Sequence, residues 1–332
     1  MSEPVLTNSD PLASNQPSIT IIIDDFSSGR RLDAFLAGLY PQLSRSLLAK
    51  TIRAGGAILD DRPTKPSTEV KSGQTLIFFP PKLEDSLEPN SEIPLDILYS
   101  DDHLLAINKP VGLVVHPGAG VTGPTLAAAL LAAEPSLASI GSPMRPGLVH
   151  RLDKDTTGVM VVAKSAMALD FLVAAFANRQ VKKYYLAFVT GNPPDCGRID
   201  LPIGRHPTKR HKMKAGLSNG KPAVTIFRVL KRFQATGLAL VSLTLLTGRT
   251  HQARVHLASI GSPVLADGLY GRKTNSLSQS HPSLDKLLTR QFLHARRLCV
   301  PHPDGRSLVF RAPWPHDFRA LLEELIKIES MS

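Results

Sequence analysis

Apolar residues at helical spacing begin soon after the start of the chain. Four of them follow the i, i+3, i+4, i+7 pattern of one helix face: Leu32, Phe35, Leu36 and Leu39. A second apolar series, at 47–52, predicts another helix with Ser44 as its N-cap and Gly55-Gly56 at its end. Apolar runs at 57–59 and 75–79 predict short strands. The pattern predicts a small module of two helices and a few strands.

Longer apolar stretches predict a second, larger region after residue 102. Continuous or alternating apolar runs predict strands at 104–107, 113–115, 159–163, 184–190 and 239–246. Helical spacing predicts helices at 124–133, 165–179 and 316–329. A shorter helix is expected at 252–260, with Thr250 able to cap it. Helices and strands are therefore interleaved throughout this region.

Length and composition agree with two folded domains. The chain has 332 residues, and domains average roughly 150 residues. Its hydrophobic content of 42% is too high for a disordered protein. No apolar run approaches the roughly 18 residues of a membrane helix, and the first residues lack the pattern of a signal peptide. With only Cys196 and Cys299, a disulfide framework is excluded and a reducing cytoplasm is expected.

The net charge of +11 is distributed unevenly along the chain. Residues 1–16 carry −2 and are expected to form a disordered tail, whereas residues 17–82 carry +3. Residues 83–102 contain seven acidic residues and no base, and are expected to form an acidic linker that leads into the second domain. Residues 103–332 carry +17. The two basic regions favour a polyanionic partner such as RNA.

The segment HRLDKDTTG at 150–158 has the highest density of reactive groups. It directly precedes the apolar run at 159–163, and a rigid strand is a good mount for a reactive loop. Asp153 and Asp155 could form a carboxylate pair, bind a cation, or be turn acids that pair with Arg151 and Lys154. Two acids beside two bases, without a third ligand, argue against a metal site. From the residues alone, salt-bridged turn acids are the simplest interpretation.

Two tyrosines follow on a predicted strand. Alternation along residues 181–191 places Tyr184 and Tyr185 on opposite faces, so one ring is expected in the core and the other available to a base or sugar. From 205 to 232 there are nine bases and no acid, which favours an RNA contact over a merely solvated surface. The candidate contacts in this span are Arg210, Lys212 and Lys214.

The last dense segment is GRTHQARVHLA at 248–258, whose spacing alone does not decide whether Arg249 or Arg254 is functional. The chain contains no Walker loop, no GxGxxG and no zinc-ligand spacing. Nucleotide hydrolysis, dinucleotide or methyl-donor chemistry and zinc chemistry therefore have no support from motifs.

Several of these motifs together resemble the RluA family of pseudouridine synthases. They are KPVGLVVHPG at 109–118, HRLDKDTTG at 150–158, KYYLAFVTG at 183–191 and GRTHQARVHLA at 248–258. RLDAFL at 31–36 and SRSLLAKTIRAGGAILDD at 44–61 resemble an S4 RNA-binding domain. With that domain in front, the chain is most similar to the subgroup that acts on large-subunit (23S) ribosomal RNA. The motifs follow the family's order and extend over nearly all of the chain beyond residue 17.

This resemblance implies a fold and a domain plan. The expected class is α+β: a pseudouridine synthase fold with a mixed, largely antiparallel sheet and flanking helices, preceded by a small S4 domain. The S4-like domain would span 17–82 and the catalytic domain 103–332. The S4 family binds structured RNA through its helix pair, which makes four residues candidate phosphate contacts: Arg31, Arg45, Lys50 and Arg53.

The resemblance also implies residue roles, and it replaces the interpretation of 150–158 as a salt-bridged turn. Asp153 matches the catalytic aspartate, and Arg151 the arginine associated with displacing the target uridine. Tyr185 matches the tyrosine of the K-x-Y-x-A-x-V-x-G motif, and Arg249 the motif arginine that pairs with the aspartate. Two positions depart from the family pattern: Ala253 replaces the usual isoleucine, and Ala266 the usual glycine before an aspartate.

Uridine isomerisation involves neither redox chemistry nor phosphate transfer, so no cofactor and no metal are expected. The expected partner is ribosomal RNA of the large subunit or its precursor particle, and we expect a cytoplasmic monomer that does not contact a membrane. A non-catalytic RNA-binding or assembly protein would have a similar charge pattern, but it would not need Asp153, Tyr185 and Arg249 together. An S4-bearing RNA methyltransferase would need a glycine-rich donor loop, which the chain lacks.

Overall fold

The computed structural model describes residues 18–40, 43, 45–80, 87–118, 123–271 and 280–331. The predicted tail at 1–16 and the proposed cap Ser44 lie outside these residues. By its contacts the chain divides into two compact units, Met1–Ser86 and Leu87–Ser332. The boundary falls within the predicted acidic segment 83–102, and each unit has its own core.

The smaller unit packs two helices on a four-stranded antiparallel sheet. Its elements are β1 (Ile19–Ile22), a short 3-10 helix (Asp25–Ser27), α1 (Leu32–Leu39), α2 (Arg45–Arg53), β2 (Ala57–Leu59), β3 (Arg62–Pro63) and β4 (Thr75–Phe78), with strand order β1-β4-β2-β3. The predicted apolar helix face is buried in this core except at Leu39, which is the last residue of α1 and is half exposed. The β2–β3 turn has Asp60 and Asp61 at positive φ, the backbone geometry of a tight hairpin.

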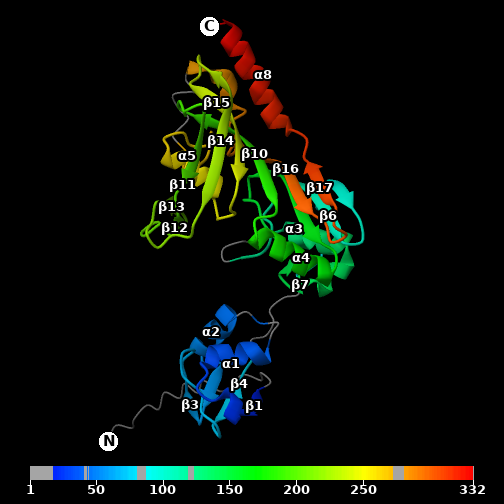
Figure 1. The fold of residues 1–332 in the computed structure, drawn as a ribbon, viewed down its shortest axis with the longest axis vertical. Coiled ribbons are helices and arrows are strands. Elements are labelled where there is room, and N and C mark those ends of the chain that lie inside the picture. The colour runs from blue at the N-terminus through cyan, green and yellow to red at the C-terminus, as the bar shows by residue number, and fades with distance from the viewer. Residues whose placement is uncertain are drawn as a thin grey trace, which may run out of the picture. The chain divides into compact units, whose positions relative to one another are not determined.

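The larger unit is built on one nine-stranded sheet (Figure 1). Its path runs β11-β14-β15-β10-β16-β9-β6-β5, and β17 pairs with β16. The only parallel pair within this described sheet is β9–β16; the other pairs are antiparallel. The strands are β5 (Ile97–Ser100), β6 (Leu104–Lys109), β9 (Thr157–Ala163), β10 (Lys182–Thr190), β11 (Cys196–Asp200), β14 (Val224–Phe233), β15 (Leu238–Leu245), β16 (Leu293–Pro301) and β17 (Ser307–Arg311). This is the mixed, largely antiparallel sheet that the sequence predicted.

Helices and short hairpins complete the larger unit. They are α3 (Leu126–Ala133), a 3-10 helix (Pro135–Ser139), β7 (Gly141–Ser142), β8 (Arg145–Pro146), α4 (Ala166–Ala177), β12 (Ile203–Arg205), β13 (Met213–Ala215), α5 (Gln252–Ser259), α7 (Pro282–Asp285) and α8 (His316–Met331). Residues of α5 pack with Ala187 and Val189 on one face of β10. Residues of α8 pack with Leu186 and Phe188 on the opposite face. The helices therefore flank both faces of the sheet. The flanking helices confirm the α+β prediction.

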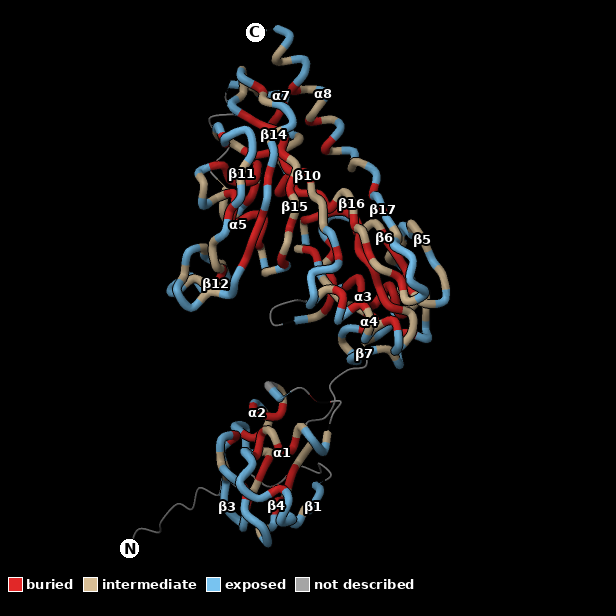
Figure 2. The backbone as a smooth tube through the Cα atoms, viewed as in Figure 1, coloured by how far each residue is buried: buried red, intermediate tan, exposed pale blue. Residues whose placement is uncertain are grey.

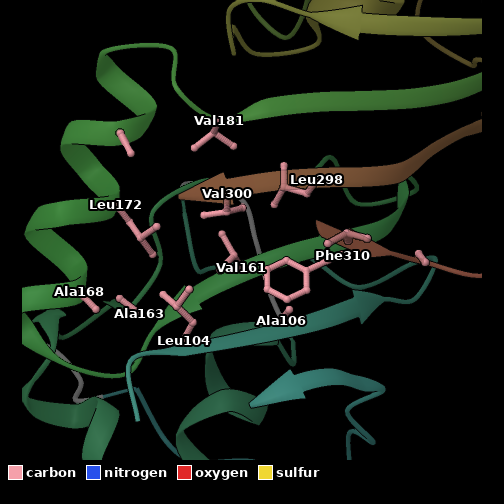
Figure 3. Close-up of a cluster of buried hydrophobic side chains, with 13 residues drawn as sticks. Leu104, Ala106, Val161, Ala163, Ala168, Leu172, Val181, Leu298, Val300 and Phe310 are labelled. Atoms are coloured by element: carbon pink, nitrogen blue, oxygen red, sulfur yellow. The ribbon is translucent and has the colours of Figure 1, made fainter. Parts of the chain in front are cut away.

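Strand β9, which lies between β16 and β6 in the sheet, is buried along its whole length (Figure 2). Helix α4 packs on one of its faces and helix α3 on the other. Val159, Val161 and Ala163 pack with residues of α4 in one cluster, part of which Figure 3 shows around Leu172. Met160 and Val162 point to the opposite face and pack with residues of α3. A strand held from both sides is a rigid support for the loop that precedes it.

Three local predictions were wrong. Residues 113–115 form no strand: Leu113 and Val115 are buried, but they lie after a turn at Gly112 with positive φ, and only Val114 makes an isolated bridge. The helix predicted at 165–179 ends at Ala177, and Arg179 has a φ of 59°. Thr250 does not cap α5, because His251 takes the N-cap position with a φ of 56° and without a side-chain cap.

Candidate active site

The loop before β9 is anchored on several sides by backbone contacts. Buried Lys109, at the end of β6, donates through Nζ to three carbonyls, including that of Lys154 at 2.9 Å. Arg290 Nη1 donates to the carbonyl of Asp155 at 3.0 Å. Burial lowers the pKa of Lys109 to about 7, although three carbonyl partners match the three donors of the charged ammonium group. The two residues that follow Asp153 in this loop are therefore held in place by hydrogen bonds.

The carboxylate of Asp153 pairs with Arg254, from α5. Arg254 Nη1 lies 3.0 Å from Oδ2 of Asp153, while its Nε and Nη2 lie 2.7 and 2.8 Å from the buried carboxylate of Asp267. Burial opposes the charge on Arg254, but its hydrogen bonds to Asp267 and the charge of Asp153 outweigh this effect and raise the pKa of Arg254. Burial likewise raises the pKa of Asp267, but Arg254 holds it below its usual value. Arg254 thus bridges two acids at the start of the helix.

Arg249 does not make the predicted pair with Asp153. Its Nε donates instead to the carbonyl of Pro222 at 3.1 Å, and the residue is partly exposed. Arg249 precedes the turn that leads into α5, whereas Arg254 lies on the helix and is buried. The motif contains both arginines, and only the fold decides which one reaches Asp153. Arg254 is therefore the partner that the motif comparison missed.

A cavity of about 350 Å³ opens at this point. All four predicted site residues line it: Arg151, Asp153, Tyr185 and Arg249. They come from the loop before β9, from β10 and from the segment before α5. The structure therefore brings together residues that lie almost 100 positions apart in the sequence.

The two tyrosines have different surroundings. Tyr185 lines the cavity, and burial, followed by the charge of Asp153, raises the pKa of its hydroxyl, so the phenol is neutral at physiological pH. Tyr184 lies on the other face of β10, where the guanidinium of Arg297 stacks 3.9 Å from its ring centre. Tyr185 is thus the ring that is available to a base.

Cationic side chains form part of the cavity wall. Lys183 Nζ donates to the carbonyl of Thr247 at 2.9 Å, and burial, with smaller contributions from Arg249 and Arg179, lowers its pKa to about 8. Arg179 and Arg151 also line the cavity, and Arg151 is exposed. This wall is suited to an anionic substrate such as an RNA backbone. The sequence comparison used Lys183 only to align a motif.

His150 has a structural role beside the cavity. Its Nε2 accepts a hydrogen bond from the backbone N–H of Val161 at 3.0 Å, and its ring stacks on Phe176. Burial lowers its pKa to about 3, so the ring is neutral and can accept this bond. His150 therefore fastens the loop to β9.

A family model described as RNA pseudouridylate synthase matches residues 103–259. Bacterial relatives named ribosomal large subunit pseudouridine synthase D match almost the whole chain. The Xanthomonas campestris protein is 42% identical over 330 residues, which cover 96% of this chain and 95% of that protein. The Nitrosomonas europaea protein is 44% identical over 313 residues, which cover 94% of this chain and 89% of that protein.

The chain belongs to the RNA pseudouridylate synthase family. Members of this family are isomerases, so the chain is an enzyme of that class. Among solved structures, human RNA pseudouridylate synthase domain containing 4 is 31% identical, with a TM-score of 0.54, and covers 70% of this chain and 93% of its own. A second human structure, domain containing 1, is 28% identical with the same TM-score and covers 74% and 98%. These likenesses agree with the predicted fold.

The basic residues that were predicted to contact RNA lie in two places. Arg31 and Arg45 are half exposed at the helix pair of the smaller unit, and both contact the carboxylate of Asp33, at 3.1 and 3.0 Å. Lys50 and Arg53 are exposed on α2. In this pseudouridylate synthase the helix pair therefore presents cations to solvent, two of them partly neutralised.

In the larger unit the remaining predicted contacts surround the β12–β13 hairpin. Arg210 and Lys214 are exposed, whereas Lys212 is partly buried and donates through Nζ to the carbonyl of Leu269 at 2.5 Å. Lys212 thus fastens the hairpin to the 267–271 loop. The described residues contain no group of three or more His, Cys, Asp and Glu side chains that could hold a metal ion. None of their helices is long and apolar enough to cross a membrane.

Proposed function

We propose that this enzyme isomerises uridine to pseudouridine in large-subunit (23S) ribosomal RNA, with Asp153 as the catalytic carboxylate. The observation that supports this most directly is the placement of Asp153 in a cavity with Tyr185 and several cations, its Oδ2 engaged by Arg254. The names of the bacterial relatives support the RNA class.

The reaction breaks the N-glycosidic bond of uridine, turns the base and rejoins it to the ribose through carbon. The carboxylate of Asp153 either attacks the sugar or takes a proton from it, and both routes require the ionised form. The Arg254 guanidinium, 3.0 Å from Oδ2, balances the negative charge of this form. No step needs a redox group or an external energy source, so the proposed reaction uses no cofactor.

A uridine within folded RNA must leave its stack before it reaches Asp153, at a cost of a few kcal/mol. Arg151 is exposed at the cavity and is suited to fill the vacated place in the RNA. Tyr185 would stack on the extruded base and hold it while it turns. Lys183, Arg179 and Arg249 would bind the neighbouring phosphates.

We assign the smaller unit, within 17–82, to RNA binding of the S4 type through Arg31, Arg45, Lys50 and Arg53. Arg210 and Lys214 on the hairpin would add contacts from the larger unit. The unit then contributes affinity and site choice, and the chemistry stays with the larger unit. A monomer in the cytoplasm, acting on ribosomal RNA or its precursor particle, completes the proposal.

The deciding experiment replaces Asp153 with asparagine. This variant keeps the size and hydrogen-bonding capacity of the side chain but has no negative charge. We expect Asp153→Asn to bind large-subunit ribosomal RNA as tightly as the wild type while pseudouridine formation falls to background. Binding is measured by filter retention, and pseudouridine by chemical mapping of an RNA transcript.

Two results would contradict the proposal. Substantial pseudouridine formation by Asp153→Asn would exclude Asp153 as the catalytic group. A wild-type protein that binds the RNA but forms no pseudouridine would favour the non-catalytic RNA-binding protein instead.

A further inference from the structure

Hydrogen bonds connect the basic β12–β13 hairpin to the immediate surroundings of Asp153. The backbone N–H of Met213 donates to the hydroxyl of Tyr270 at 2.8 Å. That hydroxyl lies 2.8 Å from Nδ1 of His251, and Nε2 of the same ring faces Oδ1 of Asp153 at 3.9 Å. Neither Tyr270 nor His251 has a role in the proposed chemistry so far.

The hydrogen bond from Met213 to Tyr270 favours one of the two neutral tautomers of His251. Met213 N–H can only donate, so of the two groups bonded to the Tyr270 hydroxyl only Nδ1 of His251 can accept its proton. An accepting Nδ1 leaves the single proton of a neutral imidazole on Nε2. In this tautomer the N–H of His251 faces Asp153.

Charged groups surround this imidazole on several sides. The carboxylates of Asp153 and Asp267 and the guanidiniums of Arg254 and Arg151 all act on it. Burial has the largest effect and lowers the pKa of His251 below its usual value, which keeps the ring neutral at pH 7. A neutral ring is the form that accepts the Tyr270 proton.

The two oxygens of Asp153 are in different situations. Oδ2 accepts from Arg254 at 3.0 Å, whereas Oδ1 has the imidazole N–H as its neighbour at 3.9 Å. This separation is too long for a hydrogen bond, so the imidazole faces Oδ1 without occupying it. Oδ1 is thus the oxygen that remains available to a substrate.

The backbone at His251 is in an uncommon conformation. Its φ of 56° lies in the left-handed region, which residues with a side chain rarely adopt. Such conformations persist where the surroundings require them, often at functional sites. The hairpin is also attached at Lys212, whose Nζ donates to Leu269 beside Tyr270, and the Arg254 guanidinium lies 5.2 Å from the Tyr270 ring centre.

We propose that His251 and Tyr270 are positioning residues that hold Oδ1 of Asp153 toward the substrate and connect it to the basic hairpin. The inference rests on the proposed function, because it gives these residues a part in the Asp153 reaction. RNA bound at the exposed cations of the hairpin is then linked to the catalytic carboxylate through Met213, Tyr270 and His251.

Two substitutions of His251 separate this role from a merely structural one. A glutamine side chain can place its amide N–H near the Nε2 position but loses the bond to Tyr270. An asparagine side chain reaches only the Nδ1 position, so it keeps the bond to Tyr270 and loses the donor near Asp153. Asparagine also tolerates a positive φ better than most residues. The two variants thus retain opposite halves of the connection.

We expect His251→Asn to lower kcat about tenfold and His251→Gln to lower kcat less, because a misplaced reacting group slows the chemical step. The KM for a large-subunit ribosomal RNA transcript should be unchanged in both variants. If His251→Asn retains as much activity as His251→Gln or more, the positioning role is excluded. We expect Tyr270→Phe to lower kcat severalfold at unchanged KM, and an unchanged kcat would exclude the connection to the hairpin. Thermal melts of each variant verify folding.

A measurement on the wild-type protein requires no variant. Nitrogen NMR of the imidazole groups distinguishes the two neutral tautomers, and we expect His251 with its proton on Nε2. A proton on Nδ1 would overturn the inference. The activities of the wild type and of Asp153→Asn are measured in parallel. A wild type without activity would count against the proposed function. The NMR measurement of the His251 tautomer would still test the hydrogen-bond chain.

Discussion

Arg254 determines the electrostatics of the site at the scale of single residues. It contacts Asp153 with one nitrogen and the fully buried Asp267 side chain with two others. A buried carboxylate without a partner is strongly unfavourable, so Arg254 has a structural task in addition to holding Asp153. Arg249 lines the same cavity, but its side chain donates to the backbone carbonyl of Pro222 and is partly exposed. The two arginines of one motif therefore contribute differently.

This difference predicts that alanine at Arg254 affects mainly stability, whereas alanine at Arg249 affects mainly RNA binding. Arg254→Ala should lower the free energy of unfolding by about 3–5 kcal/mol, because it leaves the buried carboxylate of Asp267 without its counter-ion. Arg249→Ala should change it by less than about 0.5 kcal/mol, as expected at a partly exposed position, while raising the KM for RNA. Urea denaturation measures the first quantity and initial rates the second. Equal stability of the two variants would contradict the assignment of the buried pair.

Ala266 is a second position where a single residue matters. The family's usual glycine is replaced here, and the φ of Ala266 is 55°, a conformation that glycine adopts without cost. The departure noted in the sequence thus falls on a backbone that favours the family residue. Ala253, the other departure, is buried in the core between α5 and the sheet, where a smaller side chain is accommodated.

At the scale of elements, the segment before β5 belongs to the larger unit. Leu87, Ile93 and Leu95 pack against the core that contains residues of α3, and the N–H of Asn90 donates to the carbonyl of Ala128 at 3.0 Å. The predicted acidic segment 83–102 therefore includes residues that contribute to folding. A chain that starts at Glu92, within this segment, would lack Leu87 and Asn90 and therefore the contacts that they make.

Two truncated chains test this boundary. A chain that starts at Leu87 should fold and retain pseudouridine formation with weaker RNA binding, because the larger unit has its own core. A chain that starts at Pro94 should melt several degrees lower, because it lacks two apolar contacts and one hydrogen bond. Thermal melts and activity are compared with the full chain. If the Leu87 chain does not fold, or selects its site as well as the full chain, the division of labour is wrong.

At the scale of the whole molecule, charge and chemistry are separate. Residues 103–332 carry +17, and this excess attracts an anionic chain over a long range. The acid at the centre of the proposed reaction, Asp153, lies within this positive region and is balanced locally by Arg254. The positive charge therefore governs binding, and the local pair governs the reacting group.

This separation predicts how salt and charge affect the enzyme. RNA affinity should fall steeply with salt, by close to one power of the salt concentration per neutralised phosphate. Lys214→Glu, on the exposed hairpin, should weaken RNA binding and reduce the salt slope. Lys327→Glu makes the same charge change on α8, where Lys327 faces Glu324, and serves as the control. Equal effects of both substitutions would mean that only net charge matters and that the hairpin is not a contact surface.

The sequence by itself determined the properties that depend on neighbouring residues. Helical spacing located α1, α4 and α8, apolar runs located β6, β9, β10 and β15, and the motifs identified Asp153, Arg151 and Tyr185 as residues of one cavity. These signals are local because a helix or strand repeats its buried face every few residues. The ends were less accurate where a residue at positive φ interrupts the pattern, as at Arg179 and His251.

Only the tertiary structure decided which groups meet across the fold. Arg254 rather than Arg249 reaches Asp153, although 101 positions separate the pair, and Tyr270 reaches both His251 and the hairpin. The physical reason is that a contact of this kind depends on the packing of α5 and the 267–271 loop against the sheet. Spacing within a motif cannot show which of two nearby cations such packing buries, and which it leaves at the surface.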